Sequence, residues 1–168
     1  AGLGTVEHPL LGAVVALPGS DGLVLTGRVS LATHGWLADH AVRGSVLMPG
    51  TGFVELVVRA ADEVGCDVVD ELVSEAPLIV PAAGGVQLSL AVGEADEGGR
   101  RQVTLFSRAD DADEWVRHVT ATISASGAAL ATPLLAEWPP AGAESVDVTG
   151  FYERLAAAGH EYGPAFQG

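Results

Sequence analysis

The stretch Leu37–Gly65, LADHAVRGSVLMPGTGFVELVVRAADEVG, decides the fold that we predict for this chain. Its second part repeats apolar residues at the spacing of one helix face: Phe53, Leu56, Val57, Ala60, Ala61 and Val64. Such a stripe predicts a helix that faces the core. Pro49 suits the helix start, Thr51 is a candidate cap and Gly65 a plausible stop. Polar positions are few, so we expect the helix to be covered on most of its surface.

Runs rich in valine, threonine and other apolar residues flank this helix and predict strands. They lie at 12–17, 23–31 and 41–48 before the helix, and at 68–80, 86–92, 102–109 and 115–126 after it. The short segment 33–40 is mixed and predicts a loop with a helical turn. Short loops with glycine and acidic residues separate the later runs, which favours antiparallel hairpins. One helix among antiparallel strands is an α+β pattern, in which the sheet wraps around the apolar helix.

The composition changes after the last of these strands. Residues 127–149 are rich in alanine and proline without a clear period, which is typical of a linker. Trp138, Leu134 and Leu135 predict that the linker is held against a surface. A second short helix is expected near 148–159, and Phe166 is expected to begin a further strand.

Length and composition bound the class of protein. The 168 residues fit one domain, or one domain and the beginning of another, and 48% hydrophobic residues can form a core. The net charge of −14 would repel nucleic acid phosphates. No apolar run is long enough for a membrane span, and no signal peptide is recognisable. We therefore expect a cytoplasmic protein without nucleic acid or membrane partners. The single Cys66 excludes an internal disulfide and is expected to be a small buried residue.

His40 is the candidate for chemistry, and three interpretations are open from the residues alone. It could be a structural histidine, a metal ligand or a general base. A metal site needs further ligands, and neither His34 nor Asp39 gives a recognised zinc spacing. A base is attractive because the helix start at Pro49–Gly52 would offer free backbone N–H groups. That pairing suits removal of a proton α to a thioester carbonyl, with the enolate oxygen held by the backbone. His118, within a strand, is expected to be structural or on the surface.

Three motifs now indicate a family. His40, Gly44 and Pro49 form H-x3-G-x4-P, HPLLG lies at 8–12, and GHEYGPAFQG lies at 159–168. In this order they resemble the dehydratase domains of modular type I polyketide synthases, with His160 where tyrosine is usual. The resemblance implies a hot-dog fold in which an antiparallel sheet wraps around a long central helix. It implies the first half of a double hot-dog at 1–126, a linker at 127–149 and the beginning of the second half at 150–168.

The resemblance also implies a reaction. A β-hydroxyacyl thioester arrives on the phosphopantetheine arm of an acyl carrier protein and loses water to give the α,β-enoyl product. His40 would be the base, Tyr162 would help to orient the β-hydroxyl, and Gly44 and Pro49 would shape the turn that aims the imidazole. From the helix-start argument we add Gly50, Thr51 and Gly52 as donors to the carbonyl oxygen. No metal and no directly bound cofactor is expected.

The expected partners are the acyl carrier protein and neighbouring synthase domains, with a homodimer in the intact synthase. In the family, an aspartic acid in an Asp-x3-Gln or Asp-x3-His motif of the second half protonates the leaving hydroxyl. Because that motif is not found here, we expect the chain to be a fragment, inactive alone, with an exposed apolar face prone to association.

Three other functions stay open. A relative with the same histidine could shift a double bond or close a pyran ring. A non-catalytic module could keep the fold for docking or dimerisation, although the intact H-x3-G-x4-P motif argues against this. A single hot-dog thioesterase or hydratase would need neither the linker nor the YGPAF segment.

Overall fold

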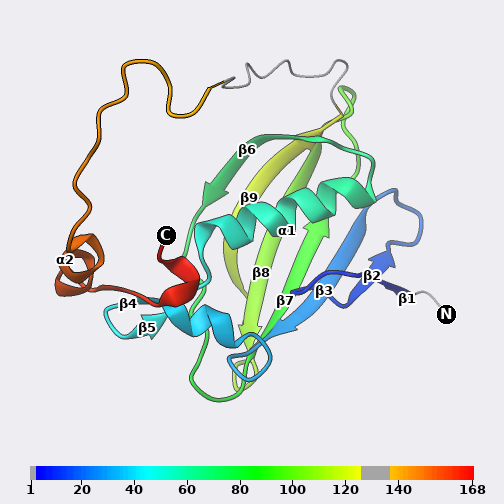
Figure 1. The fold of residues 1–168 in the computed structure, drawn as a ribbon. Coiled ribbons are helices and arrows are strands. Elements are labelled where there is room, and N and C mark those ends of the chain that lie inside the picture. The colour runs from blue at the N-terminus through cyan, green and yellow to red at the C-terminus, as the bar shows by residue number, and fades with distance from the viewer. Residues whose placement is uncertain (1–2, 126–136) are drawn as a thin grey trace.

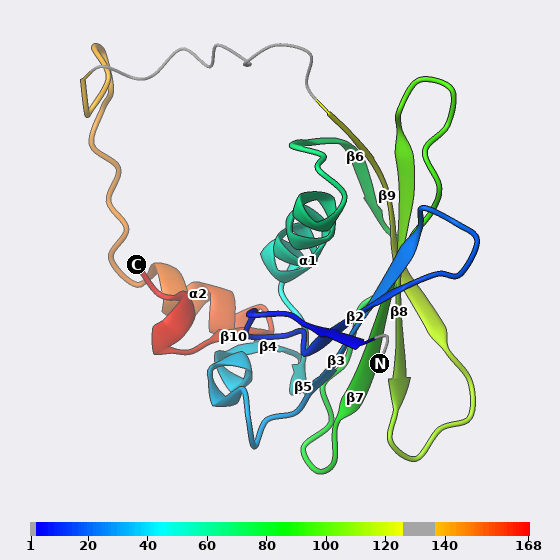
Figure 2. The ribbon, with the colours of Figure 1, turned by 90° about the vertical axis from the view of Figure 1, so that its right-hand side faces the viewer.

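The computed structural model describes residues 3–125 and 137–168, and a seven-stranded antiparallel sheet is its main element. The helix α1 (Gly50–Glu63) lies against one face of the sheet, whose strands curve around it (Figures 1 and 2). The strand order is β1-β2-β3-β7-β8-β9-β6. The strands are β1 (Leu3–Thr5), β2 (Ala13–Ala16), β3 (Leu23–Val29), β6 (Val68–Ser74), β7 (Val86–Val92), β8 (Arg101–Ala109) and β9 (Val116–Ser124). This arrangement is the hot-dog fold that the sequence predicts.

The core lies between α1 and the sheet. Alternate residues of β7 are buried because successive strand side chains point to opposite faces. They meet the predicted helix stripe, of which Phe53, Leu56, Val57, Ala60 and Ala61 are buried. Cys66 is also buried in this core, as predicted. Apolar residues recur about every 3.6 residues in the helix and every second residue in the strands, and both sets of side chains face the same core.

Two details of α1 differ from the sequence analysis. Thr51 does not cap the helix, because Pro49 is the N-cap residue and no side chain caps the helix start. Val54 and Val58 are 46% and 40% exposed, so the helix is not covered on most of its surface within the described residues. The expected stop is confirmed, since Gly65 follows the helix with a φ of 70°.

Strand pairing follows the prediction only in part. Hairpins join β7 to β8 and β8 to β9, as expected. However, β6 pairs with β9 at the edge of the sheet and forms no hairpin with β7. The expected strand at 41–48 is two short strands, β4 (His40–Val42) and β5 (Ser45–Val46). Arg43 and Gly44 join them with φ values of 50° and 77°, the left-handed backbone that tight hairpin turns require.

A small second sheet gathers the C-terminal segment against β4. Its order is β10-β4-β5, with β10 at His160–Tyr162. The helix α2 (Phe151–Ala157) precedes β10, as predicted. The helical turn expected within 33–40 is the 3-10 helix η1 (Gly35–Asp39). Phe166 ends a second 3-10 helix, η2 (Pro164–Phe166), and begins no strand, so that prediction is wrong.

The expected anchoring of the linker is also wrong for Trp138, which is 82% exposed. Leu134 and Leu135 lie outside the described residues. Among the helices of the described residues, none has the length and apolar character needed to cross a membrane.

Candidate active site

His40 opens strand β4 directly after η1, and its ring is held in one tautomer. Nδ1 lies 3.0 Å from the carbonyl oxygen of Leu47. A carbonyl oxygen only accepts hydrogen bonds, so Nδ1 carries the proton and Nε2 keeps its lone pair. Within the described residues no hydrogen bond occupies Nε2. The backbone thus leaves His40 in the form that a general base needs.

Two aromatic rings surround the imidazole. Tyr162 lies opposite His40 in the β10–β4 ladder, and the two rings stack at 5.3 Å with an angle of 13°. The Phe166 ring tilts against the imidazole at 4.9 Å and stacks on Trp36 at 6.1 Å. Of the two rings in contact with His40, Tyr162 was predicted from the sequence and Phe166 was not. Ring stacking restricts the imidazole to one orientation.

The start of α1 offers backbone donors close to this aromatic cluster. The Gly50 and Thr51 N–H groups have no hydrogen-bond partner within residues 3–125 and 137–168, as is usual for the first turn of a helix. The Gly52 N–H, in contrast, donates to the Pro49 carbonyl at 2.8 Å. A Cβ at Gly52 would lie 2.7 Å from the Met48 sulfur, so this glycine serves packing. Only Gly50 and Thr51 of the three predicted donors are free to bind an oxyanion.

A cavity of about 220 Å³ lies at the helix start, and His40 is not in its lining. Thr51 and Phe166 both line it, and Phe166 also contacts the His40 ring. A larger cavity of about 560 Å³ lies between α2 and the small sheet, with Tyr162 but not His40 in its lining. Neither cavity has His40 in its lining; the smaller one is a candidate substrate site because it includes Thr51 at the helix start and Phe166, which contacts the imidazole.

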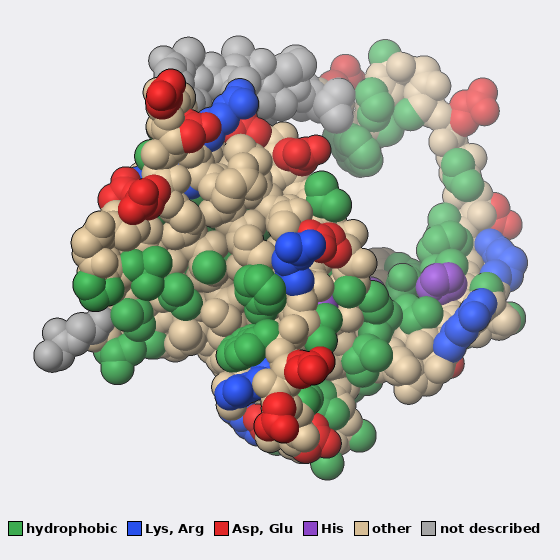
Figure 3. Space-filling view, turned by 180° about the vertical axis from the view of Figure 1, so that it is seen from behind, with side chains coloured by type: hydrophobic (Ala, Val, Ile, Leu, Met, Phe, Trp, Pro, Cys, Tyr) green, Lys and Arg blue, Asp and Glu red, His purple; other side chains and the backbone are tan. Residues whose placement is uncertain are grey.

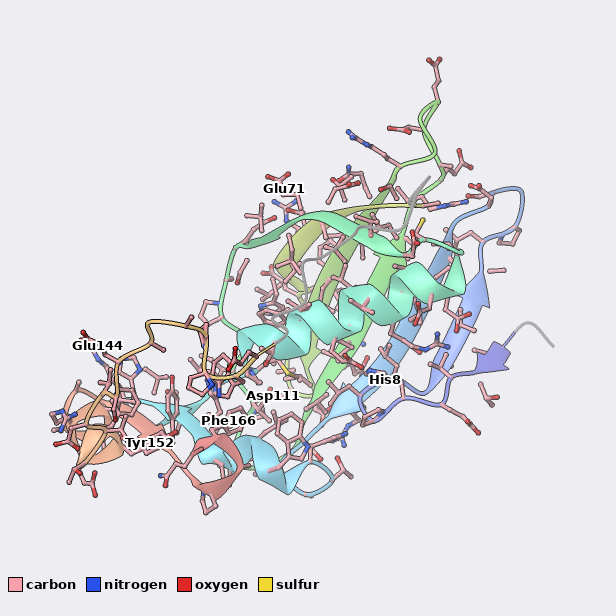
Figure 4. The ribbon with its side chains drawn as sticks, turned by 45° about the horizontal axis from the view of Figure 1, so that its top comes forward. His8, Glu71, Asp111, Glu144, Tyr152 and Phe166 are labelled. Carbon is pink, nitrogen blue, oxygen red and sulfur yellow. The ribbon has the colours of Figure 1, made fainter. Side chains whose placement is uncertain are left out.

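His8, labelled in Figure 4, borders the same cavity and is a site residue whose contacts the sequence analysis did not foresee. Its side chain is 4% exposed, and Nδ1 accepts the Leu10 N–H at 3.1 Å. Nε2 therefore carries the proton and lies 3.5 Å from the Glu55 carboxylate of α1. This contact ties the HPLLG segment to the central helix. The HPLLG motif was the one feature of the sequence that drew attention to His8.

Gly44 and Pro49 lie where a shaping role requires them. Gly44 has a φ of 77° in the β4–β5 turn, and Pro49 is buried immediately before α1. The carbonyl that fixes His40 belongs to Leu47, between these two motif residues. The H-x3-G-x4-P spacing therefore folds the chain back so that its own backbone orients the histidine.

Two other reactive groups are structural. His118 is buried, with Nδ1 donating to the Ala76 carbonyl at 3.1 Å and Nε2 accepting from Ser107 at 2.7 Å. Burial lowers the pKa of His118, so its ring is held neutral. Burial also raises the pKa of the Cys66 thiol, which disfavours the nucleophilic thiolate. Across residues 3–125 and 137–168, no three His, Cys, Asp or Glu side chains are grouped to hold a metal ion.

Comparisons with known proteins agree with this geometry. The family model for the polyketide synthase dehydratase domain matches residues 8–108, and the model for the polyketide synthase dehydratase N-terminal domain matches 130–168. The pikromycin polyketide synthase component PikAII of Streptomyces venezuelae is 57% identical over 174 residues, which cover 100% of this chain and 5% of that protein.

Solved structures extend the likeness to the fold. The crystal structure of the dehydratase domain from the terminal module of the rifamycin polyketide synthase gives a TM-score of 0.95 at 54% identity. The match covers 99% of this chain and 60% of that one. The crystal structure of the erythromycin dehydratase gives a TM-score of 0.90 at 40% identity, covering 99% of this chain and 62% of that one. The chain therefore spans a small part of its curated relative and less than two thirds of these solved domains.

A curved antiparallel sheet around one central helix defines the class: a hot-dog domain, in which the backbone orients the candidate residue His40. Within that class, the chain belongs to the polyketide synthase dehydratase family, since one family model matches more than half of its length.

Proposed function

We propose that this chain supplies the general base of a polyketide synthase dehydratase, a hydro-lyase acting on a β-hydroxyacyl thioester that an acyl carrier protein delivers. The observation that carries the proposal is the His40 ring, whose Nδ1–H is committed to Leu47 while Nε2 stays free. The sequence family and the cavity at the helix start support it.

The reaction can be written with these residues. Nε2 of His40 takes the proton from the carbon α to the thioester carbonyl, and the enolate oxygen accepts hydrogen bonds from Gly50 and Thr51. The electron pair then forms the Cα–Cβ double bond as the β-hydroxyl leaves. An acid gives that hydroxyl a proton and releases water. In this proposal Tyr162 orients the hydroxyl, and the stacking of its ring on His40 supports that role.

The acid belongs to the longer polypeptide in this proposal. The resemblance implies an aspartic acid from a second hot-dog half, and the matched solved domains are longer than this chain. We propose the division into a first half at 1–126, a linker at 127–149 and a segment at 150–168 that leads to the second half. The β10–β4 ladder keeps this last segment attached to the first half. The phosphopantetheine arm, the carrier protein, neighbouring synthase domains and a homodimeric synthase belong to the same proposal.

Two alternative outcomes use the same base. A double-bond isomerase begins by removing a proton γ to the carbonyl, whereas a pyran-forming cyclase removes the proton of a hydroxyl group that then adds to the enoyl β-carbon. The matched rifamycin and erythromycin structures are named dehydratases, and a further match at 47% identity is named a bifunctional dehydratase-cyclase domain. A docking module would need no oriented imidazole. These functions differ in product: loss of water, a moved double bond, a closed ring or no change at all.

The test is His40→Ala in the longer polypeptide, assayed with a β-hydroxyacyl chain on its carrier protein. We expect the loss of water, followed by mass spectrometry of the acyl chain, to slow by about 10²- to 10⁴-fold. His34→Ala is the matched control, because His34 bonds to Thr33 and Pro9 and contacts none of the rings around His40. Normal dehydration by His40→Ala would refute the assignment.

A further inference from the structure

Asp39 lies next to the base in the chain, yet its side chain is committed to a different segment. Oδ2 of Asp39 accepts the N–H of Ala165 at 2.9 Å. The Asp39 backbone oxygen accepts the N–H of Gly163 at 2.8 Å. One residue therefore binds the YGPAF segment at two points across 126 positions of sequence.

Gly163 shows how closely that segment is seated on Asp39. A Cβ at Gly163 would lie 2.4 Å from Oδ1 and 2.8 Å from the Cβ of Asp39. The φ of Gly163 is −86°, which any residue adopts, so the glycine is required for space and not for backbone freedom. The backbone of the segment at Gly163 therefore lies too close to the Asp39 side chain to admit a Cβ.

The two residues that flank this contact are those that hold the imidazole. Tyr162 precedes Gly163 and stacks on His40, while Phe166 follows Ala165 and tilts against the same ring. The β10–β4 ladder fixes Tyr162 from one end of the segment. At the Ala165 end, the Asp39 carboxylate makes the contact with the chain before α1.

The carboxylate oxygen serves this contact as a hydrogen-bond acceptor, a role that an amide oxygen at the same place can also fill. None of the described ion pairs involves Asp39, so no arginine competes for its oxygens there. Asp39 as a whole residue is partly buried, although its hydrogen bond with Ala165 is exposed.

From these contacts we propose that Asp39 is a positioning residue that clamps the segment Gly163–Ala165 and thereby holds Tyr162 and Phe166 against the His40 ring. Asp39 acts through its neighbours and not on the substrate. The expected effect on turnover rests on the proposed function, whereas the expected effect on the position of the two rings does not.

The test compares Asp39→Ala with Asp39→Asn in the longer polypeptide. Asparagine keeps an oxygen that can accept the Ala165 N–H but removes the charge. Two quantities are measured: dehydration of the carrier-bound substrate, and the rate at which diethyl pyrocarbonate modifies each histidine, followed by peptide mass spectrometry. His118 is the internal control for the fold, because it is buried in another part of the sheet.

We expect Asp39→Ala to lower kcat by about 10- to 100-fold with little change in KM, as small misplacements of catalytic groups do. His40 should be modified severalfold faster while His118 stays protected. Asp39→Asn should stay within about threefold of wild type in both measurements. Gly163→Ala should resemble Asp39→Ala, because the added methyl group displaces the segment from the carboxylate.

Wild-type His40 reactivity and kcat in Asp39→Ala would overturn the clamp. If Asp39→Ala also exposes His118, the alanine variant is misfolded and Asp39→Asn becomes the test. Wild-type kcat and His40 reactivity in Asp39→Asn would then support the clamp. Defects as large as those of Asp39→Ala would overturn it, because they would show that the charge of Asp39 is what matters. If His40 is modified faster in Asp39→Ala but the wild-type protein does not dehydrate the substrate, the proposed function is refuted and the clamp is still supported.

Discussion

Two histidines of this chain show how the hydrogen bonds at the two ring nitrogens decide whether an imidazole is available for chemistry. His40 and His118 both donate from Nδ1 to a backbone carbonyl. Nε2 of His118 accepts from Ser107, whereas Nε2 of His40 has no such partner within the described residues. The same residue type in the same tautomer is therefore structural in one place and a candidate base in the other.

His118 predicts a pH dependence of stability. Its pKa is lowered in the folded protein by burial, from an unfolded value of 6.5. Below about that pH the unfolded chain takes up a proton that the folded chain does not, so folding stability falls as the pH drops through this window. Above it, this histidine has no effect on the slope.

We expect guanidinium midpoints measured at about pH 7.5 and about pH 5.5 to differ less in His118→Gln than in wild type. Glutamine does not titrate, so the difference isolates the histidine from other groups. Identical pH slopes in the two proteins would contradict a buried neutral ring.

Gly44 gives a second prediction at this scale. Its φ of 77° is costly for any residue with a Cβ, although a Cβ at this position would meet no atom within 4 Å. We expect Gly44→Ala to lower the free energy of unfolding by about 1–2 kcal/mol and to reduce turnover, because the turn sets Leu47 against His40. Gly12→Ala, also open but without a positive φ, should be close to neutral in thermal melts. Equal effects of both changes would show that backbone strain is not the cause.

Sequence reasoning pointed to His40 as the candidate base but not to the contacts that orient its ring. The H-x3-G-x4-P spacing pointed to His40, Gly44 and Pro49, all of which lie within a few residues of one another. Asp39 and Ala165 are 126 positions apart, and their hydrogen bond follows from the fold of both segments. Spacing along the chain carries no information about such a pair.

At the scale of elements, the spacing of apolar residues predicted where the main helix and strands lie, but not which strands pair with one another. The stripe from Phe53 to Ala61 located α1, and the alternation in β7 located a strand with one buried face. Neither pattern specifies partners, so the pairing of β6 with β9 was not foreseen. The β4–β5 hairpin was not predicted because arginine is not a typical turn residue, although Arg43 has a φ of 50° in the structure.

The two faces of α1 yield a stability prediction. Leu56 is fully buried, and its truncation removes packing and leaves a cavity. We expect Leu56→Ala to cost about 2–5 kcal/mol of unfolding free energy in chemical denaturation. Val58→Ala, on the exposed face, is the control and should change stability by no more than about 0.5 kcal/mol. Similar losses for both would mean that the outer face of α1 is packed.

At the scale of the whole chain, the net charge is strongly negative. Acidic side chains are spread over the face shown in Figure 3. Several arginines pair with carboxylates, among them Arg28 with Asp110 and Arg101 with Asp21. Because the net charge of −14 opposes association between copies, any self-association must come from apolar surface.

The exposed face of α1 is the apolar surface that we expect to act in this way. Val54 and Val58 lie one helical turn apart on it, and the matched rifamycin structure contains further chain beyond the 60% that this chain covers. We expect the isolated 168-residue chain to self-associate through this face and to show no dehydration. The double variant Val54→Glu, Val58→Glu should sediment as a monomer, because paired charges oppose burial of the face. The matched control carries the same change at Val146 and Val148 of the linker, which are 78% and 68% exposed, and should associate like wild type. A wild-type monomer that turns over substrate would contradict both the role of this face and the need for a second half.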